Sequence, residues 1–349
     1  MKLLLLFVTG RGIGGDAVIA HTISEALNER NISTKIVLDS KAQGYYYKNK
    51  NISWLKSSIP AAGGHASTKL NLFKAGLKTI KAIIQASLLI KSEKADGVVG
   101  IIGGGVVVGC LAAKLSGVPA VGVVSTPNDT KISIKCNPTI LLPESPLFNS
   151  KNNISKYPSI DNYIPIKTDI VNGDKENILD ILPDNYNSTK KSVLFSSGST
   201  LFEDMAKAVR KYAEESDNIN IFLIGEPLND VVRDIVDYPN IMNLGYINYI
   251  KHLYDLIDLA VITDDGATLH ETIACEIPVV VVVGVKYGRY HGLSKVFDGA
   301  VIESNVDNIT SVVNDALSNE LEMKKATKKY SSNIIHGTDT LVDFILENL

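Results

Sequence analysis

Short apolar runs alternate with longer amphipathic stretches along most of this chain, and this alternation limits the folds open to it. In the first half, continuous apolar runs at 3–8, 34–38, 98–102 and 120–124 are typical of buried parallel strands. Helical patterns at 16–30, 69–91 and 106–115 lie between them. The order strand–helix–strand predicts an α/β fold with a doubly wound parallel sheet and right-handed crossovers.

The pattern starts again after a less regular segment from 126 to about 190, which holds five prolines between 138 and 165. A chain of 349 residues has room for about two domains. We therefore expect one Rossmann-like domain over 1–165, a second over 166–336, and a C-terminal helix, 337–349, that packs back on the first domain. The second half is predicted to contain strands at 193–196, 219–224, 259–263 and 279–283, and helices at 201–215, 231–236, 249–257, 268–275, 306–317, 320–331 and 338–349.

Composition narrows the class of protein. The net charge of −3 and the pI near 6.1 give no basic balance that would call for nucleic acid. Three cysteines, odd in number and far apart, exclude a disulfide framework and a CxxC metal knuckle. No apolar run reaches the length of about 18 residues that a membrane-spanning helix needs. The apolar run at 3–8 stops at a glycine-rich turn rather than at a cleavage site, so we expect a first strand and a cytoplasmic protein.

Two glycine-rich turns follow strands of the first half. The first, from Gly10 to Asp16, is compatible with a dinucleotide site that uses Asp39, or with a tight turn in which Asp16 caps a helix beginning at Ala17. The second contains Gly103, Gly104, Gly105 and Gly109, and it indicates either close helix–strand packing or a second wall of a ligand site at the same sheet edge.

The second half carries two more such turns. Ser196 to Thr200 suits a phosphate at a helix start, or is an ordinary serine-rich cap. The segment from Asp258 to Pro278 places a strand, a small-residue turn and a helix bearing Glu271, a carboxylate able to accept hydrogen bonds from two ribose hydroxyls. Since Asp264 and Asp265 would repel a phosphate, we expect them to face sugar hydroxyls or solvent.

These residues together resemble a GT-B glycosyltransferase of the MurG-like group, nearly from end to end. The family's first glycine loop, which ends Gly-Gly-His, is matched by Gly14-Gly15-Asp16, and its second by Val99 to Ala113 with Gly117-Val118-Pro119. Its hinge resembles Ile164 to Lys167, and its third loop resembles Ser196 to Thr200. Its Thr-x-x-Glu helix is matched by Thr268 and Glu271, seven residues before Pro278.

The chain departs from the family at three places. Asp16 stands where the family has a loop histidine. Tyr290-His291 stands where it has a Gln-Gln pair that reads the donor sugar. The His-Glu-Gln-Asn segment is absent after Val123, although Asn128 takes the place of its asparagine.

The resemblance implies an inverting transferase that moves N-acetylhexosamine (GlcNAc or GalNAc) from a UDP-sugar to a lipid-linked sugar-peptide of peptidoglycan or archaeal pseudomurein synthesis. It implies no cofactor and no metal, and no cluster of His, Cys and Asp has metal-ligand spacing. Asp16 is the first candidate for the general base and His65 the second, and the glycines Gly103, Gly104 and Gly105 are assigned to the acceptor. The residues assigned to the UDP-sugar are Gly14, Gly15, Asn128, Lys167, Ser197, Gly198, Ser199, Gly266, Ala267, Thr268, Leu269, Glu271, Tyr290 and His291.

The predicted helix at 69–91 contains five lysines and no acidic residue. Leu70, Phe73, Leu77, Ile80 and Ile84 form one stripe, and Lys74, Lys78 and Lys81 form another face. Such a helix either packs in the core with a solvated lysine face or lies on an anionic membrane. The lipid acceptor of the MurG-like group favours the membrane, with Phe73, Lys74, Leu77, Lys78 and Lys81 at the inner face of the cell membrane.

Other functions stay open at this point. An NAD(P)-dependent oxidoreductase would use Gly10–Gly15 with Asp39, but it leaves Thr268 and Glu271 unexplained. A GT-B-fold UDP-sugar epimerase would act without an acceptor. A non-catalytic nucleotide-sugar-binding subunit is the third alternative, because the family's loop histidine is replaced.

Overall fold

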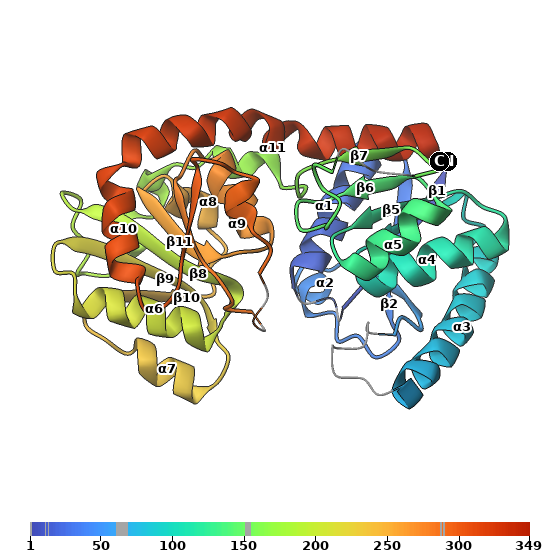
Figure 1. The fold of residues 1–349 in the computed structure, drawn as a ribbon, viewed down its shortest axis with the longest axis horizontal. Helices are drawn as coiled ribbons and strands as arrows, with labels where there is room; N and C mark the ends of the chain where they lie inside the picture. The colour runs from blue at the N-terminus through green and yellow to red at the C-terminus, as the bar shows by residue number, and fades with distance from the viewer. Residues whose placement is uncertain are drawn as a thin grey trace. The chain divides into compact units, whose positions relative to one another are not determined.

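The computed structural model describes residues 2–10, 12, 14–60, 69–150, 155–286, 288 and 290–349, with the backbone alone from 69 to 76. The chain divides into two compact units (Figure 1). Unit 1 comprises residues 1–165 and 336–349, and unit 2 comprises residues 166–335.

Unit 1 is built on a parallel sheet in which, among the described residues, seven strands follow the order β3-β2-β1-β4-β5-β6-β7. Strand β1 lies inside the sheet, between β2 and β4, and its apolar side chains are buried on both faces, as the continuous run of leucines predicts. The strands are β1 Leu3–Val8, β2 Ser33–Asp39, β3 Trp54–Ser57, β4 Gly97–Ile101, β5 Ala120–Val124, β6 Thr139–Leu141 and β7 Ser159–Asp161, and the helices are α1 Gly15–Glu29, α2 Tyr45–Asn49, α3 Lys69–Ser92, α4 Gly103–Ser116 and α5 Pro127–Cys136.

Unit 2 repeats this plan with a sheet of six described strands in the order β10-β9-β8-β11-β12-β13. Its strands are β8 Lys191–Leu201, β9 Ile219–Pro227, β10 Ile241–Gly245, β11 Leu259–Thr263, β12 Val279–Val282 and β13 Val301–Ser304. Its helices are α6 Glu203–Glu214, α7 Asp230–Val236, α8 Ile250–Tyr254, α9 Ala267–Ala274 and α10 Ile309–Ser318, with short 3₁₀ turns η1 Thr168–Val171, η2 Lys175–Asn177, η3 Leu179–Ile181 and η4 Leu293–Lys295.

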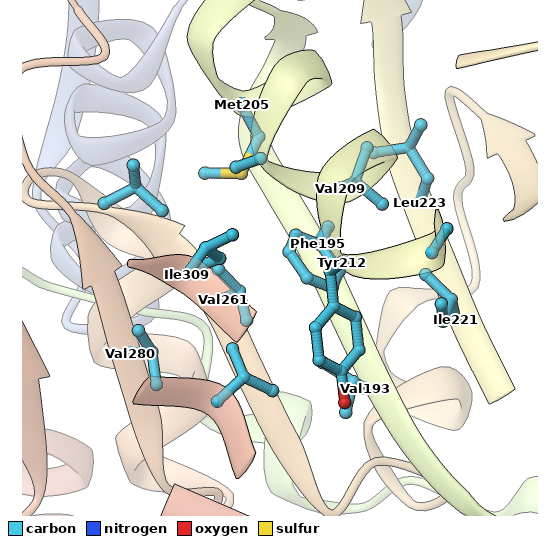
Figure 2. Packing of buried hydrophobic residues seen from close by; sticks show 14 of the residues in the cluster. Val193, Phe195, Met205, Val209, Tyr212, Ile221, Leu223, Val261, Val280 and Ile309 are labelled. Atoms are coloured by element: carbon cyan, nitrogen blue, oxygen red, sulfur yellow. The ribbon is translucent and has the colours of Figure 1, made fainter. Parts of the chain in front are cut away.

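One hydrophobic core of unit 2 lies between its central strands and helices α6 and α10 (Figure 2). Phe195 of β8 packs against Tyr212 of α6 with ring centroids 5.6 Å apart. Val261 of β11, Val280 of β12 and Ile309 of α10 complete the contact. The valine-rich strands are buried, so the turns that follow them are held on a rigid base.

The C-terminal helix α11, Glu320–Asn348, is continuous, whereas the sequence predicts two helices that end at 331 and begin at 338. Gly337 lies inside the helix, where its carbonyl accepts a hydrogen bond from the Asn162 amide at 3.0 Å. Farther along, Asp339 accepts a hydrogen bond from Arg30 at 2.9 Å, and Asp343 is also paired with Arg30. These contacts tie the last residues of the chain to unit 1.

The glycines of the second turn are mostly packing residues. A Cβ on Gly105 would lie 2.4 Å from the Phe7 carbonyl oxygen, and one on Gly109 would lie 2.7 Å from the Phe7 Cβ. A Cβ on Gly104 would lie 2.7 Å from the Pro60 carbonyl oxygen. Helix α4 therefore approaches strand β1 as closely as backbone allows, which is the packing alternative that the sequence left open.

Two sequence expectations about element boundaries are wrong. Helix α1 begins at Gly15 with Gly14 as its N-cap, so Asp16 lies in the first turn and is not the cap. Strand β8 continues through the serine-rich segment to Leu201, with an irregularity between Ser196 and Thr200, and α6 begins only at Glu203. Among the described residues, no helix combines the length and the apolar character needed to cross a bilayer.

Candidate donor site

Three neighbouring strands of unit 2 end at one edge of its sheet, and their turns carry most of the predicted donor residues. Strand β11 pairs with β8 on one side and with β12 on the other, all in parallel. Their carboxyl ends therefore bring together the segment at Gly198, the turn at Gly266 and the loop that begins at Gly284. This edge of an open α/β sheet is where such folds bind ligands.

The segment at Gly198 is a bulge inside a strand rather than a helix start. Gly198 has φ +90°, which an L side chain rarely adopts. The buried Ser197 hydroxyl donates to the Thr200 carbonyl at 2.9 Å and accepts from the Phe202 amide at 3.0 Å. Ser196 accepts from the Gly198 amide at 3.0 Å. These two hydroxyls shape the bulge, while Ser199 is exposed.

The turn at Gly266 leads directly into α9. Gly266 has φ +84°, and a Cβ placed on it would meet no atom within 4 Å, so the space in front of α9 is open. The buried His270 ring donates from Nδ1 to the Gly266 carbonyl at 3.1 Å. Burial lowers the pKa of His270 to about 4, so the ring is neutral. Leu269 is fully buried, which leaves Ala267 and Thr268 partly exposed on the first turn.

Glu271 lies on the second turn of α9. Its Oε2 accepts a hydrogen bond from the hydroxyl of buried Tyr254 at 3.3 Å. Desolvation raises the pKa of Glu271 to about 7, and the Tyr254 hydrogen bond opposes part of that rise. The Tyr254 pKa is itself raised, first by burial and then by the nearby Glu271 charge. Glu271 is thus a carboxylate held in a fixed place with one known donor.

The sequence predicts that Asp264 and Asp265 face sugar hydroxyls or solvent, but both carboxylates have partners within the protein. Asp264 is buried and accepts three backbone hydrogen bonds, from His291 at 2.7 Å, Gly292 at 2.9 Å and Leu293 at 3.0 Å. Asp265 accepts from the Thr263 hydroxyl at 2.7 Å and pairs with the Lys286 ammonium at 2.9 Å. Asp264 fixes the loop after β12, and Asp265 carries a neutralising partner.

Sequence reasoning missed Lys286 and His270. Lys286 follows an all-valine strand inside a loop that has positive φ at Gly284 and Gly288, and this combination of glycines around one lysine is the signal that could have found it. His270 gave no such signal, since a histidine on an apolar helix face is normally interpreted as a buried core residue.

Three further predicted donor residues lie outside the Gly198 and Gly266 turns: Tyr290 and His291 in the loop after β12, and Lys167 before η1. Tyr290 is exposed and its hydroxyl donates to Glu303 on β13 at 3.0 Å, while His291 contacts Asp264 through its backbone. Lys167 precedes η1, whose Ile170 carbonyl accepts from the Cys275 thiol just past the C-terminal end of α9. A cavity of about 480 Å³ opens there, lined by Tyr254, Cys275 and lysines of α8 and α11. It lies at the amino ends of β11 and β12, away from the glycine turns.

Unit 1 groups its own turns at the carboxyl edge of its sheet. Buried Asp129 accepts from the backbone amides of Gly103 at 2.6 Å and Thr126 at 2.8 Å, so it joins the starts of α4 and α5. Desolvation raises its pKa, and these hydrogen bonds oppose the rise. Asn128 beside it is exposed.

The first turn of α1 is open. A Cβ on Gly14 or Gly15 would meet no atom within 4 Å, and half-buried Asp16 follows them. His65 lies outside the described residues. The two carboxylate oxygens of Asp39 accept hydrogen bonds from the backbone amides of Lys41 at 2.9 Å and Ile59 at 2.8 Å. The carboxylate that a dinucleotide site would use is therefore already hydrogen-bonded within the protein. A Cβ on Gly12 would lie 2.8 Å from Leu38, which makes this glycine a packing residue.

The described residues contain no group of three or more His, Cys, Asp and Glu side chains arranged to hold a metal ion. The three cysteines are free thiols. The donor-site candidates are therefore backbone amides, hydroxyls, one lysine and one carboxylate.

Comparison with models of protein families finds no match, and comparison with curated protein sequences finds none. Solved structures do match over the whole chain. MurG from Acinetobacter baumannii has a TM-score of 0.69 at 15% identity, covering 99% of this chain and 100% of that one. HepE from Anabaena, solved in complex with UDP, has a TM-score of 0.65 at 13% identity, and the match covers 100% of both chains.

A putative UDP-N-acetylglucosamine 2-epimerase from Listeria monocytogenes matches with a TM-score of 0.63 at 14% identity, covering 99% of this chain and 96% of that one. The solved neighbours thus include glycosyltransferases and an epimerase with the same two-domain plan. The chain has the GT-B fold, with two Rossmann-like domains, as the sequence predicts.

The raised pKa of Glu271 makes stability depend on pH. An acid whose pKa is higher in the folded state than in the unfolded state favours folding while it is protonated, and this advantage is lost as the pH rises through about 7. Replacing Glu271 by Gln should therefore leave the free energy of unfolding unchanged near pH 4.5 and raise it at pH 8 by on the order of 2 kcal/mol.

Urea unfolding followed by circular dichroism at the two pH values measures this difference. Glu322→Gln, a change at an exposed glutamate of α11, is the control and should give the same small effect at both. A Glu271→Gln effect that does not change between pH 4.5 and 8 would contradict the raised pKa.

Proposed function

We propose that the chain is an inverting glycosyltransferase that takes N-acetylhexosamine from a UDP-sugar. The observation that carries this proposal is the placement of Glu271 on the second turn of α9, behind the open turn at Gly266. That turn follows β11, which pairs with β8, the strand that carries the Gly198 bulge. A helix start offers amides to a phosphate, and a carboxylate on the next turn can accept from both ribose hydroxyls. One solved neighbour is named for a UDP-sugar and another was solved in complex with UDP, which supports the choice of nucleotide.

In this proposal the acceptor binds unit 1 and the donor binds unit 2. The acceptor oxygen forms a bond to the anomeric carbon as the bond from that carbon to the β-phosphate oxygen of UDP breaks. Asp16 takes the acceptor proton as general base. Backbone amides at the Gly266 turn stabilise the charge on the departing diphosphate. Gly103, Gly104 and Gly105 contribute to the acceptor side by shaping the start of α4.

The acceptor is proposed to be a lipid-linked sugar-peptide of cell-wall synthesis, presented at the inner face of the membrane. Helix α3 supports this part of the proposal. Its buried face, with Ala82, Ala86 and Ile90, packs on the core of unit 1. Its opposite face exposes four large apolar side chains, each more than half exposed, and the members of this α3 stripe are Leu77, Ile80, Ile84 and Leu88.

Two lysines flank the α3 stripe, and an exposed leucine on the neighbouring helix α4 adds to its apolar surface. Lys78 and Lys81 are exposed along one side of it. Ser87 and Ser116 lie in contact, with their hydroxyl oxygens 2.8 Å apart, and Leu115 next to Ser116 on α4 is also exposed. An exposed apolar stripe flanked by lysines fits an anionic lipid surface. Phe73 and Lys74, predicted for the same surface, are described by their backbone alone.

An alternative is a UDP-sugar epimerase, which the Listeria neighbour favours. It would bind the same nucleotide and release a changed UDP-sugar without any acceptor. Product analysis with and without a lipid-linked acceptor separates the two functions.

Glu271 should be needed for the ribose. Wild-type protein should bind UDP more tightly than 2′-deoxyuridine diphosphate, and Glu271→Gln should weaken UDP by about 1–3 kcal/mol, the range for a hydrogen bond to a charged group. Because the variant has lost that contact, its affinities for the two nucleotides should be nearly equal. Isothermal titration measures all four affinities, with Glu322→Gln as the control. Equal UDP binding by wild type and Glu271→Gln would remove the donor-site assignment.

The variant Asp16→Asn distinguishes two roles of Asp16, that of a general base and that of a residue that only stabilises helix α1. In the first turn of a helix, loss of the charge costs about 0.3–1 kcal/mol, so the melting temperature should fall only slightly. Turnover with saturating UDP-sugar and a lipid-linked acceptor should fall on the order of 10²–10⁴-fold with UDP affinity unchanged. A loss below about threefold would remove Asp16 from the mechanism, and His65 would become the candidate to test.

The α3 stripe should bind vesicles that contain anionic lipid. Each lysine near such a surface contributes about 1 kcal/mol at low salt. Lys78→Gln with Lys81→Gln should therefore weaken co-sedimentation roughly 30-fold, and Leu77→Asn with Ile84→Asn should abolish it. Leu321→Asn, at an exposed leucine of unit 2, is the matched control and should bind as wild type does. If wild-type protein stays in the supernatant at low salt, the membrane proposal fails.

A further inference from the structure

Lys286 lies at the centre of the turns that form the candidate donor site. Its ammonium is 2.9 Å from the Asp265 carboxylate, and it would be 3.8 Å from a Cβ placed on Gly198. These contacts join the loop after β12 to the turn after β11 and to the bulge in β8. The lysine side chain is 25% exposed, so it is neither buried in the core nor free in solvent.

The loop that carries Lys286 is anchored at its far end. Three backbone amides, those of His291, Gly292 and Leu293, bind the buried Asp264 carboxylate. Asp264 and Asp265 are consecutive residues of one turn, so the turn that fixes the loop also holds the ammonium. The Asp265 carboxylate thus holds the Lys286 ammonium directly, and the Asp264 carboxylate next to it binds the far end of the same loop.

The negative charge of Asp265 means that a diphosphate could bind at this turn only with a cation nearby. A diphosphate that approached the first turn of α9 would meet the Asp265 carboxylate, which by itself repels it. The 2.9 Å pair with Lys286 cancels that charge. An ammonium has three donors, and the described contact with Asp265 uses one of them, so it can turn a second one toward an anion beside Gly198.

We infer that Lys286 is the cationic contact of the nucleotide diphosphate, held in place by Asp265, and this inference rests on the proposed function. It places an ammonium donor, whose charge Asp265 balances, where the leaving group gains negative charge. Such a group stabilises the diphosphate more in the transition state than in the bound donor. Lys286 thus selects nucleoside diphosphates over nucleosides and supports departure of UDP.

The test compares UDP with uridine by isothermal titration. Lys286→Gln should weaken UDP about 10–100-fold, the change that corresponds to loss of a charge-assisted hydrogen bond. Uridine, which has no phosphate, should bind the variant within about twofold of wild type. Lys286→Arg keeps the charge and should retain most of the UDP affinity. Lys295→Gln removes a lysine near the Tyr290 ring and is the matched control.

Each other outcome has a distinct meaning. If wild-type protein binds neither UDP nor uridine, the proposed function fails before Lys286 is tested. If wild type binds both and Lys286→Gln weakens both equally, the lysine only supports the loop, and the inference is overturned. Unchanged UDP affinity in Lys286→Gln overturns it as well. A turnover assay adds a second readout, since kcat for Lys286→Gln should fall at saturating UDP-sugar.

Discussion

The candidate site depends on the buried Asp264 carboxylate and the three backbone amides that bind it. A carboxylate away from water is tolerated only when hydrogen bonds replace its hydration, and bonds to an ionised acceptor are stronger than neutral ones. The three amides come from the start of η4, so the ion locks the loop after β12 onto the turn after β11. The same turn carries Asp265, which pairs with Lys286 near the start of that loop.

Unit 1 uses the same device at the corresponding edge of its sheet. Asp129 is fully buried and accepts amides from the starts of two helices, α4 and α5. In both units a carboxylate replaces direct backbone pairing between turns that follow different parallel strands. Parallel strands leave such turns without hairpin bonds to one another. A buried aspartate is a compact way to join them, and it leaves neighbouring glycines such as Gly14 and Gly266 open.

The central strands were predictable because a strand that is buried on both faces consists of a continuous run of apolar residues. Leu3–Val8, Ala120–Val124 and Leu259–Thr263 have the predicted limits. The edge strands β3, β7, β10 and β13 were missed, since a strand at the edge is only partly buried and carries residues such as Lys56 and Asn243. The interior strand β6 was missed as well, because its three residues are too few to show a pattern. The two helices predicted at the C-terminus are one helix, α11, because a long helix tolerates a glycine such as Gly337 when packing favours its length.

The site was predictable only in part, for a related reason. Residues proposed to contact a ligand through the backbone, such as Gly266, are glycines that the sequence makes visible, and Glu271 stands at a recognisable spacing from Pro278. The roles of Asp264 and Asp265 depend on partners 21 to 29 residues away along the chain, and no local sequence pattern indicates such a partner. Electrostatic reasoning from the sequence treated Asp265 as an isolated charge that must avoid phosphate. Lys286 lies 2.9 Å from it, and in our proposal the same aspartate favours a phosphate there, because it orients the cation that would bind the phosphate.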